Sequence, residues 1–279
     1  MFLPVGRLDW KPGWIFIAFL VAAFGTSFLV LARINPSIYR ARSRFQPGTK
    51  RWDLILVSLI FAAMITEVPL AAFDAGRMAW SSMSMAFVIL GYALLGTGIA
   101  LSTWAQAVNP FFEPGVRVQR ERGQQVISKG PYAIVRHPGY VGALMIFAGM
   151  ALSLASWWAL IPAVWASLIL IVRTKWEDDL LRTELEGYSE YAKRIRYRLF
   201  PHLWRSSHSS LAPAMSQRVT SCSLASAGFG PIVDAFSKIV VANKVDVLRS
   251  AAAPDQQRSL RATSAGWLRA ANCRRRRCA

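Results

Sequence analysis

The chain has 279 residues, of which 54% are hydrophobic and 17% are charged, and its formal net charge is +18. Soluble domains carry about 25% charged residues, and a disordered basic chain would lack this much apolar side chain, so the composition argues against both. Long apolar stretches with basic residues between and after them are typical of a membrane protein. The three cysteines have neither the spacing of a zinc site nor that of a disulfide framework, so no metal site is expected.

Uncharged runs predict the first three membrane-spanning helices. The run from Trp14 to Ala32 is long enough to cross about 30 Å of hydrocarbon, and we expect it to be retained rather than cleaved as a signal peptide. The second span is predicted over Leu54 to Phe73, and the third over Trp80 to about Val108. An acid inside a span is a candidate functional group, but the position of Glu67 beside Pro69 favours an interfacial or helix-kinking role, outside the candidate site.

The last apolar stretch runs from Gly139 to Val172 and is too long for one span, because a single helix of this length would extend about 51 Å. We therefore expect it to fold back as two short helices. The turn is predicted near Ser153 to Trp158, where small polar residues and indoles gather.

Basic residues between the spans predict the orientation. The segments Arg33 to Arg51 and Arg117 to Arg136 are rich in arginine and lysine, so both are expected on the cytoplasmic side. The predicted fold class is therefore an all-α integral membrane protein with about five transmembrane helices, the last two a short helical hairpin. Its N terminus is expected outside and its C terminus inside.

Three regions follow from this organisation. Residues 1–79 hold the first two spans, and residues 80–204 hold the third span, a polar loop, the hairpin and a C-terminal amphipathic segment. Residues 205–279 form a basic tail that is expected to be mostly disordered, because it has few apolar residues. Its terminal arginine run could recruit anionic lipid or nucleic acid, but a solvated tail explains it as well, so no nucleic-acid partner is expected.

Polar residues gather at both ends of the predicted hairpin. The segment Asn109 to Tyr140 precedes it, and the segment Arg173 to Asp179 follows it. Because a hairpin returns the chain to its starting face, the two segments are expected to form one pocket at the cytoplasmic boundary. Arg173 and Glu177 are four residues apart, so on a helix they can either pair or point at one ligand. His137 precedes a proline that can start the next helix, which also allows a structural role.

The string from Gly130 to Gly142 reads GPYAIVRHPGYVG. It resembles the signature G-P-Y-x-x-x-R-H-P-x-Y-x-G of membrane-embedded methyltransferases of the isoprenylcysteine carboxyl methyltransferase type, which are related to the phospholipid methyltransferases. In that family a helical hairpin follows, then an arginine with a glutamate four residues on, then a paired-tyrosine segment. This chain has Arg173, Glu177 and the segment Gly187 to Arg194 in the same order, so the resemblance covers about residues 80 to 204.

The resemblance implies an enzyme that transfers a methyl group from S-adenosylmethionine to a lipophilic acceptor, such as the carboxylate of an isoprenylcysteine. By position, the residues that match cofactor contacts are Gln119, Gln124, Gln125, Val126, Ile127, Tyr132, His137, Pro138, Gly139, Tyr140 and Glu177. Arg173 matches the residue that faces the acceptor carboxylate, and Arg173 and His137 are the candidate catalytic residues. The stretch from Gln119 to Gln124 is shorter than in the animal enzyme, and Asp178 stands where many members have a second glutamate.

These residue types suit that chemistry. The faces of Tyr132 and Tyr140 can accept a sulfonium cation, Glu177 can bind an α-amino group, and donors around His137 can bind a carboxylate. A carboxylate acceptor needs no general base, but it must be held in line with the methyl group, and the planar guanidinium of Arg173 suits that task. The cofactor pocket is expected on the cytoplasmic side, without a metal or a covalent nucleophile.

Two other functions are compatible with the same pattern. Membrane sterol and steroid reductases, which use NADPH, have a similar string R-H-P-N-Y-x-G-E, but Gly139 and Ala143 stand here in place of its asparagine and glutamate. The third possibility is a non-catalytic membrane protein that binds lipid through its basic loops. Even for a methyltransferase, a free fatty acid, an isoprenoid acid or a phospholipid amine could serve as the acceptor in place of isoprenylcysteine.

Overall fold

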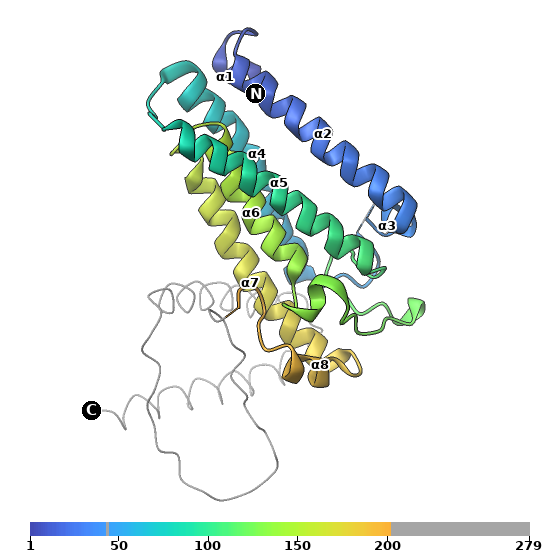
Figure 1. Ribbon diagram of the computed structural model, residues 1–279. Helices are drawn as coiled ribbons and strands as arrows, with labels where there is room; N and C mark the ends of the chain where they lie inside the picture. The colour runs from blue at the N-terminus through green and yellow to red at the C-terminus, as the bar shows by residue number, and fades with distance from the viewer. Residues whose placement is uncertain (43–44, 202–279) are drawn as a thin grey trace, which may run out of the picture. The chain divides into compact units, whose positions relative to one another are not determined.

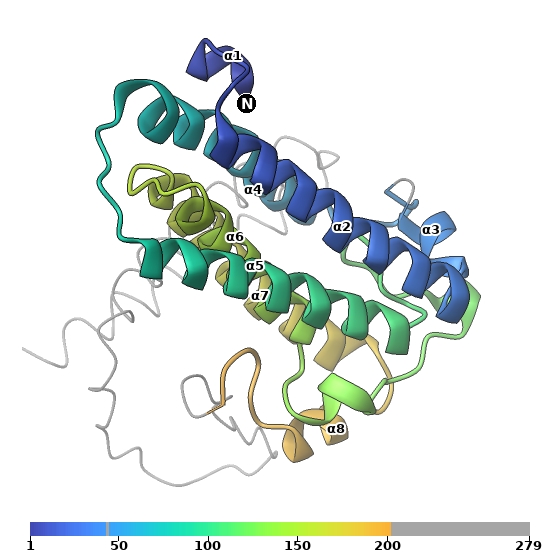
Figure 2. The same cartoon turned by 45° about the horizontal axis from the view of Figure 1, so that its top comes forward.

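The computed structural model describes residues 1–42 and 45–201, and the secondary-structure elements within these ranges are helices. Long helices run alongside one another in Figures 1 and 2. They are α2 (Lys11–Ile34), α4 (Arg51–Ala71), α5 (Met85–Val108), α6 (Pro138–Ser153) and α7 (Leu160–Glu184). The shorter elements are α1 (Phe2–Val5), α3 (Ser37–Arg42), the π-helix η1 (Ala72–Met78), the 3-10 helices η2 (Arg120–Arg122) and η3 (Gly130–Ala133), and α8 (Tyr188–Arg194). The predicted basic tail lies outside the described residues.

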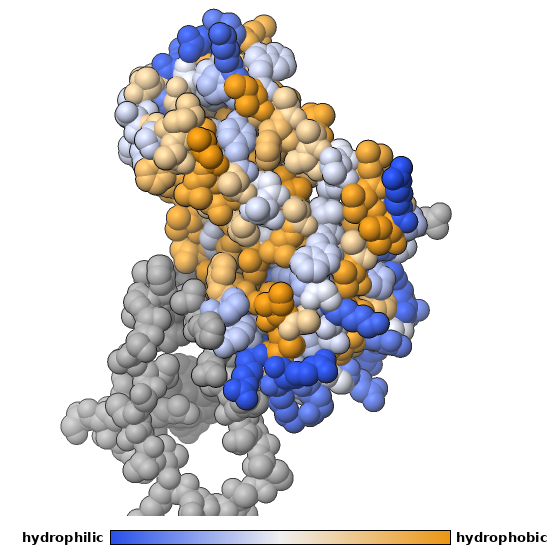
Figure 3. Space-filling model, in the orientation of Figure 1, coloured by the Kyte–Doolittle hydropathy of each residue, from blue (hydrophilic) through white to orange (hydrophobic). Residues whose placement is uncertain are grey.

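Within residues 1–42 and 45–201, three helices are long and apolar enough to cross a membrane, namely α2, α4 with its continuation η1, and α5. Helix α6 is apolar but has only 16 residues. Helix α7 has 25 residues, but it becomes polar from Arg173 onward. The described residues therefore form a multi-pass helical membrane protein with three to four apolar helices long enough to span a membrane, where about five spans were predicted, the last two as a short hairpin. Figure 3 shows apolar side chains over the helical body and hydrophilic ones gathered at its two ends.

Helix α4 begins at Arg51 and continues through η1 to Met78, so this helical segment extends beyond the predicted span of Leu54 to Phe73 at both ends. Pro69 does not end it, because the helix continues to Ala71 and then widens into η1. Glu67 is buried in the described structure, at 1% exposure, and neither of its carboxyl oxygens has a hydrogen-bond partner among the described residues. The side chain thus lies within the helical packing, where its neighbours include the backbone of Ala151 in α6.

The predicted fold-back is confirmed, with the turn at residues 154–159 between α6 and α7. Asp74 of η1 anchors this turn, because its carboxylate accepts hydrogen bonds from the hydroxyls of Ser81 and Ser156. The backbone N–H of Ser81 donates to the same carboxylate at 3.0 Å. Ala155 adopts the left-handed conformation, with φ of 56°, which reverses the chain. A buried carboxylate from an earlier helix therefore fixes the hairpin at the end of the molecule opposite the polar loop.

Glycines allow α5 and α6 to approach closely. A Cβ atom on Gly98 would lie 2.7 Å from the carbonyl oxygen of Gly142. Seven residues along each helix, a Cβ atom on Gly149 would lie 2.9 Å from the carbonyl oxygen of Gly91. Small residues at such spacing let helix backbones pack together in a membrane. Because α6 begins at Pro138, this packing fixes the position of the sequence motif.

Candidate active site

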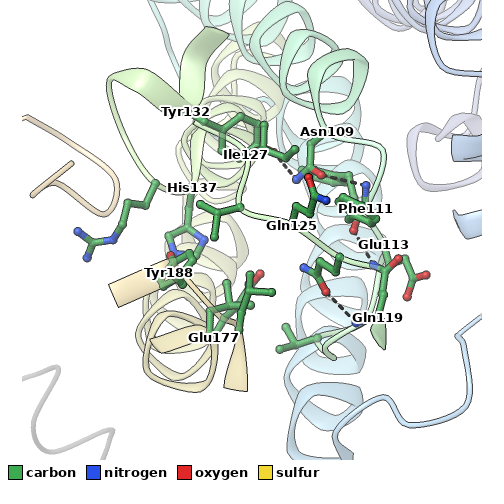
Figure 4. Close-up of a pocket in the computed structure, with 18 of the residues that line it drawn as sticks. Asn109, Phe111, Glu113, Gln119, Gln125, Ile127, Tyr132, His137, Glu177 and Tyr188 are labelled. Carbon is green, nitrogen blue, oxygen red and sulfur yellow. Dashed lines mark hydrogen bonds between the residues drawn. The ribbon is translucent and has the colours of Figure 1, made fainter. Parts of the chain in front are cut away.

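A cavity lies at the end of the helical body, between the loop that joins α5 to α6 and the polar part of α7 with α8 (Figure 4). Ten of the predicted site residues line it: Gln119, Gln124, Gln125, Val126, Ile127, Tyr132, His137, Gly139, Tyr140 and Glu177. Pro138 and Arg173 are not among the lining residues. Two segments separated by the whole hairpin thus meet at one cavity, as the sequence predicted.

The cavity has further lining residues to which sequence reasoning gave no role. They are Asn109, Phe111, Phe112, Glu113, Gly115, Val116, Arg117, Arg136, Leu181, Leu185, Tyr188 and Tyr191. The first four belong to a polar and aromatic run directly after the third span, and the two tyrosines belong to the paired-tyrosine segment Gly187 to Arg194. These two sequence features could have predicted that the six residues line the site.

Gln119 holds the loop wall of the cavity together. Its side-chain amide donates to the carbonyl of Phe111 at 2.7 Å and accepts from Arg122 at 2.6 Å. Its backbone N–H donates to the side chain of Gln124 at 2.7 Å. The side-chain amide of Gln119 therefore forms its hydrogen bonds within the loop. Gln119 stabilises the cavity wall through these bonds.

Asp178 holds the opposite wall. Its fully buried carboxylate accepts two hydrogen bonds from Arg136, at 2.7 and 3.0 Å, and one from the hydroxyl of Tyr188, at 3.0 Å. Arg198 and Arg182 donate to it at 2.9 and 3.1 Å. This one carboxylate therefore joins the start of α6, the polar half of α7, α8 and the segment that follows α8.

His137 lies between Asp178 and the cavity. Its Nε2 is 3.6 Å from the Asp178 carboxylate, which is too far for an ordinary hydrogen bond, and it has no hydrogen-bond partner among the described residues. The ring stacks on Tyr140 with 5.5 Å between centroids. Although burial favours a neutral carboxyl group, interactions with His137 and Arg136 hold the pKa of Asp178 well below its usual range. A buried ring nitrogen beside a cavity and without a partner is available to a ligand.

Tyr140 connects the two predicted residues of α7. Its hydroxyl donates to the carboxylate of Glu177, and the Arg173 guanidinium carbon lies 5.2 Å from the centre of its ring. Arg173 and Glu177 do not pair with each other. The structure therefore separates a carboxylate and a guanidinium along one helix, with a phenol ring between them.

Asp53 of α4 is the actual partner of Arg173. Its fully buried carboxylate accepts from Arg173 at 2.7 and 3.2 Å and from the backbone N–H of Val116 at 2.7 Å. Arg173 also donates to the carbonyl of Pro114 at 2.7 Å. An acid of the second span, 120 residues away, thus holds the predicted acceptor-binding arginine against the cavity loop.

The lining residues fit S-adenosylmethionine. The cavity is lined by Tyr132, Tyr140 and Tyr188, whose ring faces could accept a sulfonium group, and by Glu177, whose carboxylate could accept hydrogen bonds from an amino group. The Nε2 of His137, which has no hydrogen-bond partner within the described residues, can donate to the carboxylate of S-adenosylmethionine from an N–H group. Burial raises the pKa of Tyr132 and of Tyr188 well above the usual value. Both side chains are therefore neutral phenols at neutral pH.

The described residues form a multi-pass helical membrane protein with a cavity lined by aromatic, acidic and amide side chains at one end. Residues 86–186 match the phospholipid methyltransferase family, so the segment from α5 to the end of α7 is a domain of that family. Enzymes of this family use S-adenosylmethionine and act on lipid acceptors. The match includes every predicted site residue and favours a methyltransferase over a reductase or a non-catalytic protein. No curated protein matched the chain.

Proposed function

We propose that this methyltransferase acts on the carboxylate of a lipophilic acceptor, as an isoprenylcysteine carboxyl methyltransferase does. The observation that supports this proposal is the placement of Glu177 and Arg173 on one face of α7, with the Tyr140 ring against both. Glu177 suits the cationic amino group of the cofactor, and Arg173 suits an anionic acceptor. The residue proposed to bind the cofactor and the residue proposed to bind the acceptor are therefore one helical turn apart.

The residues act by binding and orientation. When bound, S-adenosylmethionine supplies an electrophilic methyl group on a sulfonium, and its transfer to a carboxylate oxygen leaves a thioether and a methyl ester without releasing a proton. The wall held by Gln119 and the wall held by Asp178 would enclose the cofactor, and His137 and Glu177 would orient it. Arg173 orients the acceptor, and this alignment can supply about 7–11 kcal/mol of the barrier reduction. No residue needs to act as a general base.

The cavity is proposed to face the cytoplasm. It lies at the same end of the molecule as the basic segment 33–51, because Lys50 donates its backbone N–H to the carbonyl of Val116 at 3.1 Å and pairs with Glu184 at 2.9 Å. Basic loops stay on the cytoplasmic side of a membrane. The apolar tail of an acceptor would then lie along the membrane-facing helices while its head group reaches the cavity.

Methyl transfer to paired lipids tests this proposal. The full chain in lipid nanodiscs is supplied with S-adenosylmethionine labelled on the methyl group, together with either an S-farnesylated N-acetylcysteine or phosphatidylethanolamine. We expect label on the first lipid that base releases as methanol, because an ester has formed. Base-stable label on phosphatidylethanolamine alone would overturn the carboxylate assignment in favour of amine methylation. Arg173→Gln should abolish the ester, whereas Lys175→Gln, which removes the same charge two residues along α7, should not.

A further inference from the structure

Arg42 is a cation beside the cavity without an acidic partner among the described residues. It is the last residue of α3 and is exposed. Its guanidinium carbon lies 5.2 Å from the centre of the Phe112 ring, and Phe112 lines the cavity. The same ring packs against Gly139, where a Cβ atom would come within 2.7 Å of it. Phe112 therefore positions Arg42 at the edge of the cavity, next to the His-Pro-Gly-Tyr motif.

The charges around Arg173 leave a role for a second cation. Arg173 already shares its guanidinium with the buried Asp53, so this pair is neutral as a unit. Arg42 lies over Phe112, which packs against Gly139, and Arg173 lies over the ring of the next residue, Tyr140. The two guanidinium groups thus flank the same short motif. Two guanidinium groups and one carboxylate give this edge of the cavity a net charge of +1.

The cofactor does not supply the missing negative charge. Its sulfonium, ammonium and carboxylate groups sum to one positive charge, which the carboxylate of Glu177 can balance. The positive charge at Arg42 is then left for an anionic group that is neither protein nor cofactor. A guanidinium stacked on an aromatic ring keeps its N–H groups in its own plane, available to carboxylate or phosphate oxygens.

We propose that Arg42 binds the anionic group of the acceptor lipid at the Phe112 edge of the cavity. This inference rests on the proposed function, since it assumes an acceptor with an anionic head group. The group is the carboxylate that receives the methyl or, if the acceptor is a phospholipid amine, the adjacent phosphodiester. Arg42 lies outside residues 86–186, so a residue outside the family domain contributes to the choice of substrate.

Equilibrium binding without turnover tests this role. The full chain in nanodiscs of neutral phosphatidylcholine, saturated with S-adenosylhomocysteine, is titrated with S-farnesyl-N-acetylcysteine, with its carboxamide, and with a short-chain phosphatidylethanolamine. Arg42→Gln is compared with Arg33→Gln, an exposed arginine of the same basic segment. We expect Arg42→Gln to weaken binding of the carboxylate probe about 10- to 100-fold, the effect of one charge-assisted hydrogen bond, and to leave the carboxamide unchanged. Arg42→Lys should restore part of the loss.

The probes distinguish the source of the anionic group. A loss confined to the carboxylate probe assigns Arg42 to the methyl-accepting group, and a loss confined to the phospholipid assigns it to the phosphodiester. The proposal is overturned if Arg42→Gln affects neither probe or if Arg33→Gln has an equal effect. Loss of S-adenosylhomocysteine affinity in Arg42→Gln would also overturn it.

The proposed function can fail without this inference failing. If the wild type forms no methyl ester from the farnesylated probe, the carboxylate assignment is wrong. The binding comparison still decides whether Arg42 holds an anionic head group, because it involves no methyl transfer.

Discussion

Arg136 and Asp178 form a fully buried ion pair with two hydrogen bonds, which joins the residue before His137 to the residue after Glu177. Removing one partner of a buried pair leaves an uncompensated charge and costs about 3–5 kcal/mol. We therefore expect Asp178→Asn to lower the melting temperature of the purified protein strongly. Asp179→Asn is the matched control, because its carboxylate is 56% exposed, and it should leave the melting temperature unchanged. Equal melting of the two variants would show that the pair does not hold the site together.

The same carboxylate predicts how stability depends on pH. Asp178 lies in the polar part of α7, and its pKa in the folded protein is lowered by His137 and Arg136 against the effect of burial. Its contribution is therefore fully present above the unfolded-state pKa of about 4 and is lost as pH falls toward the folded-state value. Melting curves should show an acid-dependent loss of stability below about pH 4. That loss should be smaller in Asp178→Asn than in the wild type.

The packing of α5 against α6 predicts a second effect on stability. Gly98→Ala and Gly142→Ala would each force apart backbones that are in contact, and overpacking of this kind costs about 1–3 kcal/mol. Gly25→Ala in α2 is the control, because nothing lies within 4 Å of the added methyl group. Melting temperatures in detergent measure the difference. If all three variants melt alike, α5 and α6 do not pack as described.

The ion pair between Asp53 and Arg173 predicts that a substitution at Asp53, outside residues 86–186, changes the kinetics of the enzyme. Asp53→Asn removes the carboxylate that orients Arg173, and we expect kcat/KM for the acceptor to fall about tenfold or more while cofactor affinity stays unchanged. Asp53→Glu, which keeps the charge, should recover part of the loss. Asp9→Asn, whose side chain is 80% exposed, should have no effect. A parallel loss of cofactor affinity would mean that Asp53 shapes the cavity rather than Arg173.

The helical organisation was predictable because it depends on local patterns. Uncharged runs located α2, α4 and α5, and the excess length of the last run located the turn of the hairpin. Most of the cavity lining was also predictable, since the motif from Tyr132 to Tyr140 and the residue Glu177 carry a recognisable spacing. Both an uncharged run and a contiguous motif can be recognised from the amino-acid sequence alone.

The individual side-chain pairs between distant segments were not predictable. Nothing in the sequence around Asp53 indicates that it pairs with Arg173 rather than leaving that residue to Glu177. The sequence also does not show whether both arms of the hairpin cross the membrane, because α6 is short and α7 is polar from Arg173. The burial of Glu67 likewise depends on its neighbours in α6, which no local pattern identifies.

Cofactor binding is the most direct test of the account. The purified full chain is titrated by calorimetry with S-adenosylmethionine and, in parallel, with NADPH. We predict saturable binding of S-adenosylmethionine, weakened about 10- to 100-fold by Glu177→Gln and also weakened by His137→Ala, but not by Glu186→Gln at an exposed position outside the cavity lining. Binding of NADPH alone, or of neither cofactor by protein that still melts cooperatively, would contradict the assignment of this cavity to S-adenosylmethionine.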